Sequence, residues 1–596
     1  MRLNNLFFIL LSSALFSQTS FNYQRDWATY VGAIDTGITG LYEDSYSHIF
    51  VDARTSSPNP SIGTPPASYY NQFITAGSQP YTGSYTIPNN FSGKLTSAGS
   101  LISAGYSPYI TSDLSAKFPY FRDHNGNRYD FRINPSNPAL PPGAWLSNAP
   151  DSLNNILTKY DVNNTMLWQT YLPGNDSFNK LEVDDDGNIY VAGATKWQNL
   201  ADPGTFQPVF SVVYGPAGEL LPNTYLVKLN PQGQKIWATY TPSSLLSGLT
   251  VSGNKVYICG NNDLKPAGAD LSTSGTFQPA KAGQFIAEIN ASTGQRTWGT
   301  YYGIPGNMLA AGISDIKADD TGVYITGATF GVPGSYYATE GAYKAQSADA
   351  DMFVTKFNPS GGRIWSTYIG TNAEETFSGD RGLDIKNGKV LFTGLSYGDQ
   401  NISTPGAYIA TKPNPNGQDI FFSMLDSSTG FPDFISYYGG TGNSFHPNDI
   451  QCIFSIDSDG FFLYGSTGRT TGFSSANGYQ QTIIYPGGIT TGSSGFIAKF
   501  SPKTLSASEA DPAGDLMLYN NPNNGNFSIK GTVLQQEPHM IAIHDVSGRL
   551  LYSRPMQKRK EEHFRLEHLL AYGNYIVSVT KGDQTVVKTF KLMIRK

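Results

Sequence analysis

The feature that most constrains this chain is a recurring motif of four residues. It begins with an aromatic residue, has Thr or Ser at the third position and ends with Tyr. Five copies begin with tryptophan and a sixth, degenerate copy begins with phenylalanine; they are Trp27–Tyr30, Trp168–Tyr171, Trp237–Tyr240, Trp298–Tyr301, Trp365–Tyr368 and Phe434–Tyr437. Successive copies are 141, 69, 61, 67 and 69 residues apart. A period of this length indicates one supersecondary unit that packs against copies of itself.

Each period also contains apolar runs that follow turn residues, such as Ile189–Gly193 and Val256–Gly260, and a further run such as Leu226–Asn230 leads directly into the tryptophan motif. Runs that are apolar on both faces predict strands that are covered on both faces. Four short strands in roughly 67 residues are typical of one blade of a β-propeller. The motif set resembles the bacterial β-propeller repeat family called SBBP over roughly residues 25–500, and this resemblance implies a propeller fold.

The two ends of the repeat region predict how the ring closes. The last period ends with the strand Gly495–Phe500 and has no aromatic strand after it, whereas the chain begins with an isolated one at Arg25–Tyr30. Pairing these two segments completes a sixth blade and removes the exposed strand edges of an open array. We therefore expect an all-β protein, a six-bladed β-propeller closed by an N-terminal strand, followed by a small C-terminal antiparallel β-sandwich.

Composition excludes several classes of protein. Only 14% of the residues are charged, while Gly 63, Tyr 37 and Phe 34 favour turns and strands over helices. With 39% hydrophobic residues the chain can bury a large core, so it is not disordered as a whole. A formal net charge of −6 provides no basic surface for nucleic acid, and no motif points to a cofactor.

The N-terminal 17 residues have the parts of a secretory signal peptide: an early Arg2, the apolar run Leu6–Leu11 and small residues before a cleavage site predicted between Ser17 and Gln18. We expect the mature chain to be exported through the periplasm and to contain no transmembrane segment. Its two cysteines, Cys259 and Cys452, lie in apolar runs and are predicted to be buried thiols.

The C-terminal segment differs in charge from the rest. Residues 516–596 contain 12 Lys or Arg and 6 Asp or Glu, a net +6, which leaves a net −12 for residues 1–515. Three ordered motifs, Leu518–Phe527, Ile541–Leu550 and Gly573–Val577, resemble the type A C-terminal sorting domain of the type IX secretion system of Bacteroidetes-type bacteria. The resemblance implies recognition by the outer-membrane export machinery and a secreted or outer-surface location. The predicted domains are a signal peptide at 1–17, a propeller at 18–500, a linker at 501–515 and a sorting domain at 516–596.

The first period exceeds the others by about 75 residues, which predicts an insertion at about 55–150 in the first blade. Its aromatic and charged residues suit stacking on a glycan or anchoring of a surface protein. The candidate binding residues are Tyr120, Arg122, Asp123, Arg128, Tyr129 and Trp145. The alternative is a decorated blade edge without a ligand.

Acidic residues suggest two other sites. Asp315, Asp384 and Asp449 open the innermost strands of three blades, where they could hold a hard cation or form hydrogen bonds between blades. Glu374 and Glu375, with Asp380 and Arg381 nearby, are the best carboxylate cluster for acid/base chemistry.

No nucleophile elbow, helical zinc pair or phosphate-binding loop is recognisable in the sequence. We therefore expect a non-enzymatic binding, adhesion or structural protein of the cell surface. The alternative is a secreted polysaccharide hydrolase or lyase with a site at the mouth of the propeller.

Overall fold

The computed structural model describes residues 21–595 except for 33–35, 45, 56–88, 108–120, 124, 134–137, 151–154, 164, 175–179, 216, 243–244, 263–269, 308–309, 372, 378–380, 398–400, 416, 442–447, 457, 484–491, 504–515, 522, 537, 546–548 and 583–585. The predicted signal peptide with Ser17 and Gln18, the candidate Tyr120, Asp380 and most of the predicted linker lie outside these residues. The chain divides into two compact units, Met1–Pro502 and Lys503–Lys596.

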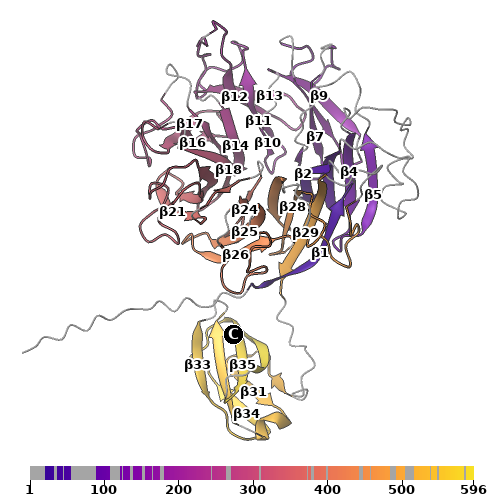
Figure 1. Cartoon of the computed structure of the whole chain (residues 1–596), viewed down its shortest axis with the longest axis vertical. Coiled ribbons are helices and arrows are strands. Elements are labelled where there is room, and N and C mark those ends of the chain that lie inside the picture. The colour runs from indigo at the N-terminus through magenta and orange to yellow at the C-terminus, as the bar shows by residue number, and fades with distance from the viewer. Residues whose placement is uncertain are drawn as a thin grey trace, which may run out of the picture. The chain divides into compact units, whose positions relative to one another are not determined.

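The described part of the first unit consists of seven antiparallel sheets, six with four strands and one with five, in a ring (Figure 1). Sheet I contains β2 (Thr36–Glu43), β3 (Ile49–Thr55), β4 (Asn89–Leu95) and β5 (Leu101–Ser107). Sheet II contains β6 (Phe121–Arg122), β7 (Arg128–Ile133), β8 (Asn155–Tyr160) and β9 (Met166–Leu172). Sheet III contains β10 (Lys180–Val183), β11 (Ile189–Thr195), β12 (Asn223–Leu229) and β13 (Lys235–Thr241). Sheet IV contains β14 (Leu245–Ser252), β15 (Lys255–Asn261), β16 (Gln284–Asn290) and β17 (Arg296–Tyr302).

The remaining three sheets complete the first unit. Sheet V contains β18 (Ala311–Asp319), β19 (Gly322–Thr329), β20 (Met352–Phe357) and β21 (Arg363–Ile369). Sheet VI contains β22 (Glu375–Thr376), β23 (Leu383–Lys386), β24 (Lys389–Ser396), β25 (Asp419–Asp426) and β26 (Pro432–Tyr438). Sheet VII contains β27 (Asn448–Phe454), β28 (Phe461–Thr467), β29 (Ser494–Pro502) and, from the N-terminal region, β1 (Tyr23–Val31).

The predicted pairing of the two ends of the repeat region is confirmed. Strand β1 runs antiparallel to β29, with Arg25 opposite Phe500 and Tyr30 opposite Phe496. The N-terminal strand thus becomes the outermost strand of sheet VII.

The described residues of the first unit form seven sheets and not the six that were predicted, because the first period contains two sheets. The segment at 55–150 that we expected to be an insertion supplies β4 and β5 to sheet I and β6 and β7 to sheet II. Strand β5 has the register of a tryptophan strand, since Ser103 pairs with Lys94 as Trp237 pairs with Lys228. Ser103–Tyr106, with the sequence Ser-Ala-Gly-Tyr, is therefore a seventh copy of the motif that lacks its tryptophan and threonine.

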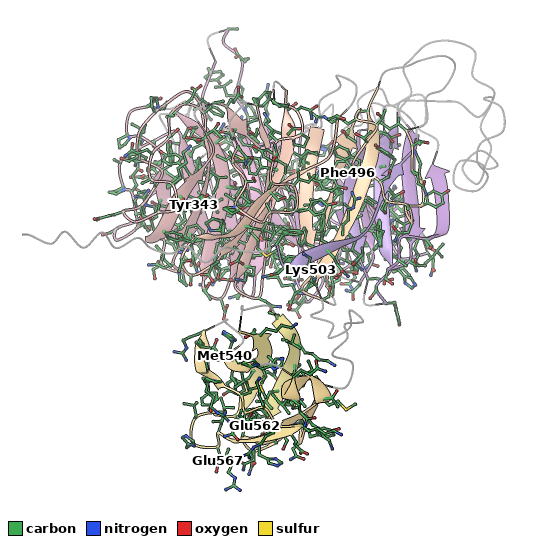
Figure 2. The ribbon with its side chains drawn as sticks, turned by 60° about the horizontal axis from the view of Figure 1, so that its bottom comes forward. Tyr343, Phe496, Lys503, Met540, Glu562 and Glu567 are labelled. Atoms are coloured by element: carbon green, nitrogen blue, oxygen red, sulfur yellow. The ribbon has the colours of Figure 1, made fainter. Side chains whose placement is uncertain are left out.

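Neighbouring sheets are held together mainly by apolar cores. Among the described residues, six clusters of buried hydrophobic side chains each join two adjacent sheets. Phe496 on β29, for example, packs between sheets VI and VII (Figure 2). Sheets I and II are joined differently, because the buried guanidinium of Arg122 donates two hydrogen bonds to the Asp52 carboxylate, at 2.9 and 3.1 Å.

The recurring tryptophan forms what we call the tryptophan clamp. In each of five sheets its indole Nε1 donates to a backbone carbonyl in a turn of the next sheet, at 2.9–3.0 Å; the pairs are Trp27–Ser97, Trp168–Pro231, Trp237–Ala291, Trp298–Pro359 and Trp365–Ser427. In four of these clamps a lysine on the neighbouring strand donates to the same carbonyl, as Lys228 does at 3.1 Å beside Trp237. A glycine in the left-handed conformation lies against the indole, as Gly294 does at φ +72°. Glycine is needed there because the Cβ of any other residue would lie only 2.9 Å from the ring.

The second unit is a small antiparallel sandwich. One sheet contains β30 (Met517–Tyr519), β31 (Asn526–Lys530) and β34 (Glu561–Arg565), and the other contains β33 (Leu550–Pro555), β32 (His539–Asp545), β35 (Gly573–Lys581) and β36 (Val586–Ile594). A short 3-10 helix spans Thr532–Gln535. One core that includes Phe527, Ile541 and Val577 is shared by both sheets.

Candidate functional site

Two adjoining cavities lie where the innermost strands of the first unit meet, with volumes of about 180 and 60 Å³. Strands β2, β6, β10, β14, β18, β23 and β27, one from each sheet, contribute to their walls. Figure 1 places the labels of β10, β14 and β18 toward the centre of the ring and those of β5, β9 and β21 toward its periphery. Phe121, Glu182, Lys317 and Arg381 line both cavities, so we treat them as one central cavity.

One register position of the innermost strands supplies much of the cavity wall. It lies opposite the second residue of the apolar run in the strand that follows. Glu182 lies opposite Tyr190 in this way, and Lys317 lies opposite Tyr324. The seven sheets carry seven different residues there: Tyr42, Phe121, Glu182, Thr250, Lys317, Asp384 and Ile453. All of them except Thr250 line the larger cavity.

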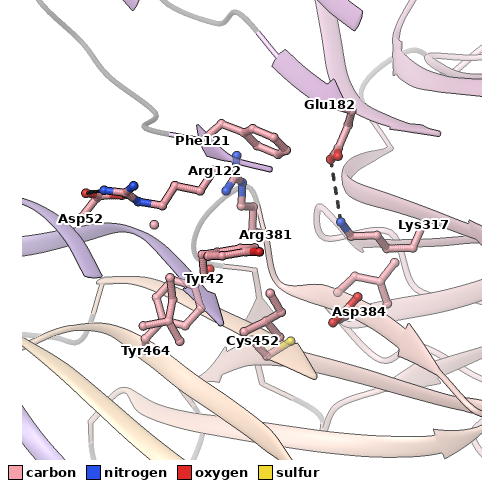
Figure 3. Close-up of a pocket in the computed structure, with 14 residues that line it drawn as sticks. Tyr42, Asp52, Phe121, Arg122, Glu182, Lys317, Arg381, Asp384, Cys452 and Tyr464 are labelled. Atoms are coloured by element: carbon pink, nitrogen blue, oxygen red, sulfur yellow. Dashed lines mark hydrogen bonds and ion pairs between the residues drawn. The ribbon is translucent and has the colours of Figure 1, made fainter. Parts of the chain in front are cut away.

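Three charged side chains meet in the cavity without a hydrogen-bonding partner in the described part of the chain (Figure 3). Glu182 Oε1 and Lys317 Nζ form a loose ion pair at 3.9 Å. The Arg381 guanidinium lies 5.4 Å from the centre of the Phe121 ring, and its side chain forms no ion pair there. We call Glu182, Lys317 and Arg381 the charged trio; Glu182 lies in sheet III, Lys317 lies in sheet V, and Arg381 lies just before β23 of sheet VI.

The protein around the cavity shifts the titration of these groups. Burial raises the pKa of Glu182, and the nearby Lys317 and Arg381 oppose this shift. Burial lowers the pKa of Lys317, but the surrounding carboxylates, Glu182 first, outweigh it, so that the pKa lies above its usual value. Glu182 and Lys317 keep 23% and 26% of their side-chain surface exposed on the cavity wall, yet protein surrounds them beyond the cavity, which explains the effect of burial.

Two of the three predicted cation ligands form hydrogen bonds between sheets. Asp315 accepts from the backbone N–H of Leu383 in sheet VI at 3.1 Å, and Asp384 accepts from that of Phe454 in sheet VII at 2.7 Å. Each also accepts from the N–H of the residue that follows it. Burial raises the pKa of Asp315 to about 7 and raises that of Asp384 as well.

The structure describes no side chain for the third predicted ligand, Asp449. In the residues that it does describe, no group of three or more His, Cys, Asp or Glu is arranged to hold a metal ion.

The predicted glycan contacts belong mostly to the body of sheet II. Arg122 and Asp123 are buried; Arg122 pairs with Asp52, while Asp123 accepts hydrogen bonds from its own turn and from the hydroxyl of Tyr129 at 2.9 Å. Tyr129 is fully buried, and Arg128 forms an ion pair with Asp130 at 3.0 Å. Arg122 also reaches the wall of the central cavity.

The half-buried Trp145 packs beside Trp197, with 6.5 Å between ring centroids.

The predicted acid/base cluster is divided between different environments. Glu375 is buried, and its carboxylate accepts from Thr371 N at 2.7 Å and from Ser396 Oγ at 2.9 Å. Burial raises the pKa of Glu375. Glu374 is exposed, whereas Arg381 lines the central cavity. The cluster therefore offers no pair of carboxylates around one substrate site among the described residues.

Sequence reasoning missed Glu182 and Lys317. The sequence contained a signal that could have found both residues. The register position opposite the second residue of each apolar run varies in residue type, while the positions around it repeat. Both cysteines are buried and unpaired, as predicted; Cys452 lies on the cavity wall, where burial raises its pKa.

Comparison with known proteins identifies the second unit. Residues 517–595 match the family model described as "Secretion system C-terminal sorting domain". The match supports a type IX sorting domain, which indicates export by that system, contact with its machinery, and a cell-surface or secreted location. No curated protein matches the chain in sequence. In the described residues we find no helix with the length and apolar character needed to cross a membrane.

Solved structures resemble the chain only weakly. A protein of unknown function from Bacteroides caccae is 9% identical, with a TM-score of 0.26, and the match covers 58% of this chain and 89% of that one. The phage phi92 endosialidase is 10% identical, with a TM-score of 0.32 and coverage of 82% and 71%. A lignostilbene dioxygenase from Pseudomonas brassicacearum is 11% identical, with a TM-score of 0.33 and coverage of 75% and 86%. At these scores the likeness carries no argument about function.

Proposed function

We propose that the first unit is a closed, seven-bladed β-propeller that the sorting domain carries to the cell surface, where it binds a polar ligand in its central cavity without catalysing a reaction. Strand β1 fills the outer position of sheet VII, and inner strands of all seven sheets line the cavity. Such a ring leaves no sheet without neighbours on both faces.

The observation that carries the binding function is the charged trio. Buried or half-buried polar groups of a folded protein are normally hydrogen-bonded, and exceptions need an explanation. The acidic neighbours Asp52, Asp315 and Asp384 each have hydrogen-bonding partners. The charged trio has none among the described residues, and its charged groups line the cavity. A polar ligand would complete these hydrogen bonds.

Export can be tested separately from binding. A chain that ends at Asp511 should accumulate in the periplasm, while the full chain reaches the cell surface; immunoblots of periplasmic and surface fractions would measure this. As a control, a reporter followed by residues 516–596 should reach the surface. Normal surface display of the shortened chain would contradict the role of the second unit.

The alternative function, a polysaccharide hydrolase or lyase, is favoured by one observation, the raised pKa of Glu182 in a cavity. Glycosidases of the usual type need a second carboxylate beside the first. Asp384 also lines the larger cavity and acts electrostatically on Glu182, but its two oxygens already accept backbone hydrogen bonds from Ile385 and Phe454. Release of reducing ends or unsaturated sugars from polysaccharides, abolished by Glu182→Gln, would establish the enzyme and refute the binding-only function.

A further inference from the structure

We infer that the central cavity binds a sugar acid, a compact polyhydroxylated ring that carries one carboxylate. The inference rests on the proposed binding function and names the chemical class of its ligand. It is drawn from which charged groups in the cavity already have partners and which do not.

Arg381 is positioned to receive the carboxylate. Its backbone carbonyl accepts a hydrogen bond from Cys452 N in sheet VII at 3.2 Å, which holds this residue in place just before β23. Its guanidinium faces the Phe121 ring and has no carboxylate within ion-pair distance in the described residues. A guanidinium binds a carboxylate through two parallel hydrogen bonds, and no described residue occupies this fork in Arg381.

The contrast with Arg122 on the same wall supports this assignment. Arg122 also lines the cavity, but its Nε and one terminal nitrogen donate to Asp52, and its other terminal nitrogen donates to Gly126 O at 3.2 Å. Its fork is therefore occupied by a carboxylate of the protein. No described carboxylate holds Arg381 in this way, so a ligand carboxylate can take that place.

Glu182 and Lys317 suit the hydroxyl groups of the same ligand. A carboxylate accepts hydrogen bonds from hydroxyls, and an ammonium donates to their oxygens. Lys317 also balances the charge of Glu182, Asp315 and Asp384, so the wall does not repel an anion as strongly as its acidic residues suggest. Among the described residues, two cationic donors and one anionic acceptor form no hydrogen bond, so the site favours a molecule with both an acid and hydroxyls.

The size and apolar surface of the cavity limit the ligand further. A volume of about 180 Å³, with about 60 Å³ adjoining, is smaller than the roughly 300–1,000 Å³ of sites for drug-sized ligands. The rings of Tyr42, Phe121 and Tyr464 line the larger part. A single sugar ring has the apolar C–H face that such rings pack against, and it is compact enough for this space.

The test is binding of single sugars to the full chain, measured by ligand-observed NMR and titration calorimetry. Glucuronate carries the acid, glucose is its neutral counterpart, and glucosamine is its cationic counterpart. We expect glucuronate to bind at least about tenfold more tightly than glucose, the factor that about 1.4 kcal/mol of charge-assisted hydrogen bonding gives. Glucosamine should bind more weakly than glucuronate.

Variants assign the contacts. Arg381→Gln should weaken glucuronate binding at least about tenfold and leave the weak binding of glucose unchanged, while Arg381→Lys, which keeps the charge but loses the fork, should fall between. Glu182→Gln should weaken both sugars by a similar factor, because it replaces a charged acceptor for hydroxyl groups with a neutral amide. The matched control is Arg549→Gln, an exposed arginine of the second unit that should change nothing. Circular dichroism melts of each variant verify that it is folded.

The outcomes separate the ligand class from the broader function. Equal or tighter binding of glucose or glucosamine overturns the sugar acid and leaves a binding function standing. Binding of glucuronate that Arg381→Gln does not weaken overturns the assignment of the site. If none of the three sugars binds to a folded, surface-displayed protein, the inference is refuted, and a glycan array with the full chain then decides the binding function on its own.

Discussion

The periphery and the centre of the first unit use the same sheets in opposite ways. On the outermost strands, five sheets repeat one tryptophan whose indole donates to a carbonyl of the next sheet, and four of them add a lysine to the same carbonyl. On the innermost strands, one register position carries seven different residues. The difference teaches that the repeated positions join the sheets, while the position that escapes repetition lines the central cavity.

The largest expected effect tests the periphery. Trp237 is 4% exposed and contacts both sheets III and IV, so Trp237→Ala should lower the free energy of unfolding by about 4 kcal/mol through lost burial, a cavity and the lost hydrogen bond. Urea unfolding followed by circular dichroism measures this change.

A milder substitution at the same position separates packing from hydrogen bonding. Trp237→Phe reproduces the residue that Phe434 provides in sheet VI, and Lys228 still donates to the Ala291 carbonyl. We expect a loss of about 1 kcal/mol. If Trp237→Ala cost no more than that, the clamp would not be what joins the sheets.

An intermediate effect concerns the hydrogen bonds between inner strands. The pKa of Asp315 is raised to about 7 in the folded protein, above its value of about 3.9 in an unfolded chain, so the folded state binds the proton more tightly. This group therefore contributes stability at low pH that is lost as the pH rises from about 4 to about 7.

The variant Asp315→Asn removes this titration, although it weakens the bond to Leu383 N. The difference in unfolding free energy, variant minus parent, should increase between pH 4 and pH 8. Thermal melts across this range, with Asp185→Asn in the exposed turn between β10 and β11 as the counterpart, would reveal it. A difference that is constant with pH would mean that Asp315 titrates normally.

The smallest expected effect is at the centre. Glu182 forms no hydrogen bond with another described residue and only a loose ion pair, so Glu182→Gln should change the unfolding free energy by less than about 1 kcal/mol. The same urea titration serves for this variant. A loss as large as that of Trp237→Ala would erase the distinction between a structural periphery and a ligand-binding centre.

Sequence reasoning recovered the features that repeat. The tryptophan motif predicted sheets that pack on both faces, the unpaired ends predicted the pairing of β1 with β29, and the C-terminal motifs predicted the sorting domain. It miscounted the sheets because Ser103 replaces tryptophan and Gly105 replaces threonine in one copy of the motif. It proposed ligand contacts for Arg122 and Tyr129, but Arg122 is buried where sheets I and II meet, and Tyr129 is buried in the core between sheets II and III.

The sequence by itself determined the class of fold, the unit that repeats and the address of export, because strand alternation, turn residues and sorting motifs act within short stretches of chain. The tertiary structure alone decided the number of sheets and the site. Glu182, Lys317 and Arg381 are separated by 135 and 64 residues in the chain, and they meet because the ring brings the innermost strands together. Whether a charged side chain faces a partner or a cavity depends on how these strands are arranged in space, and no local pattern in the sequence encodes it.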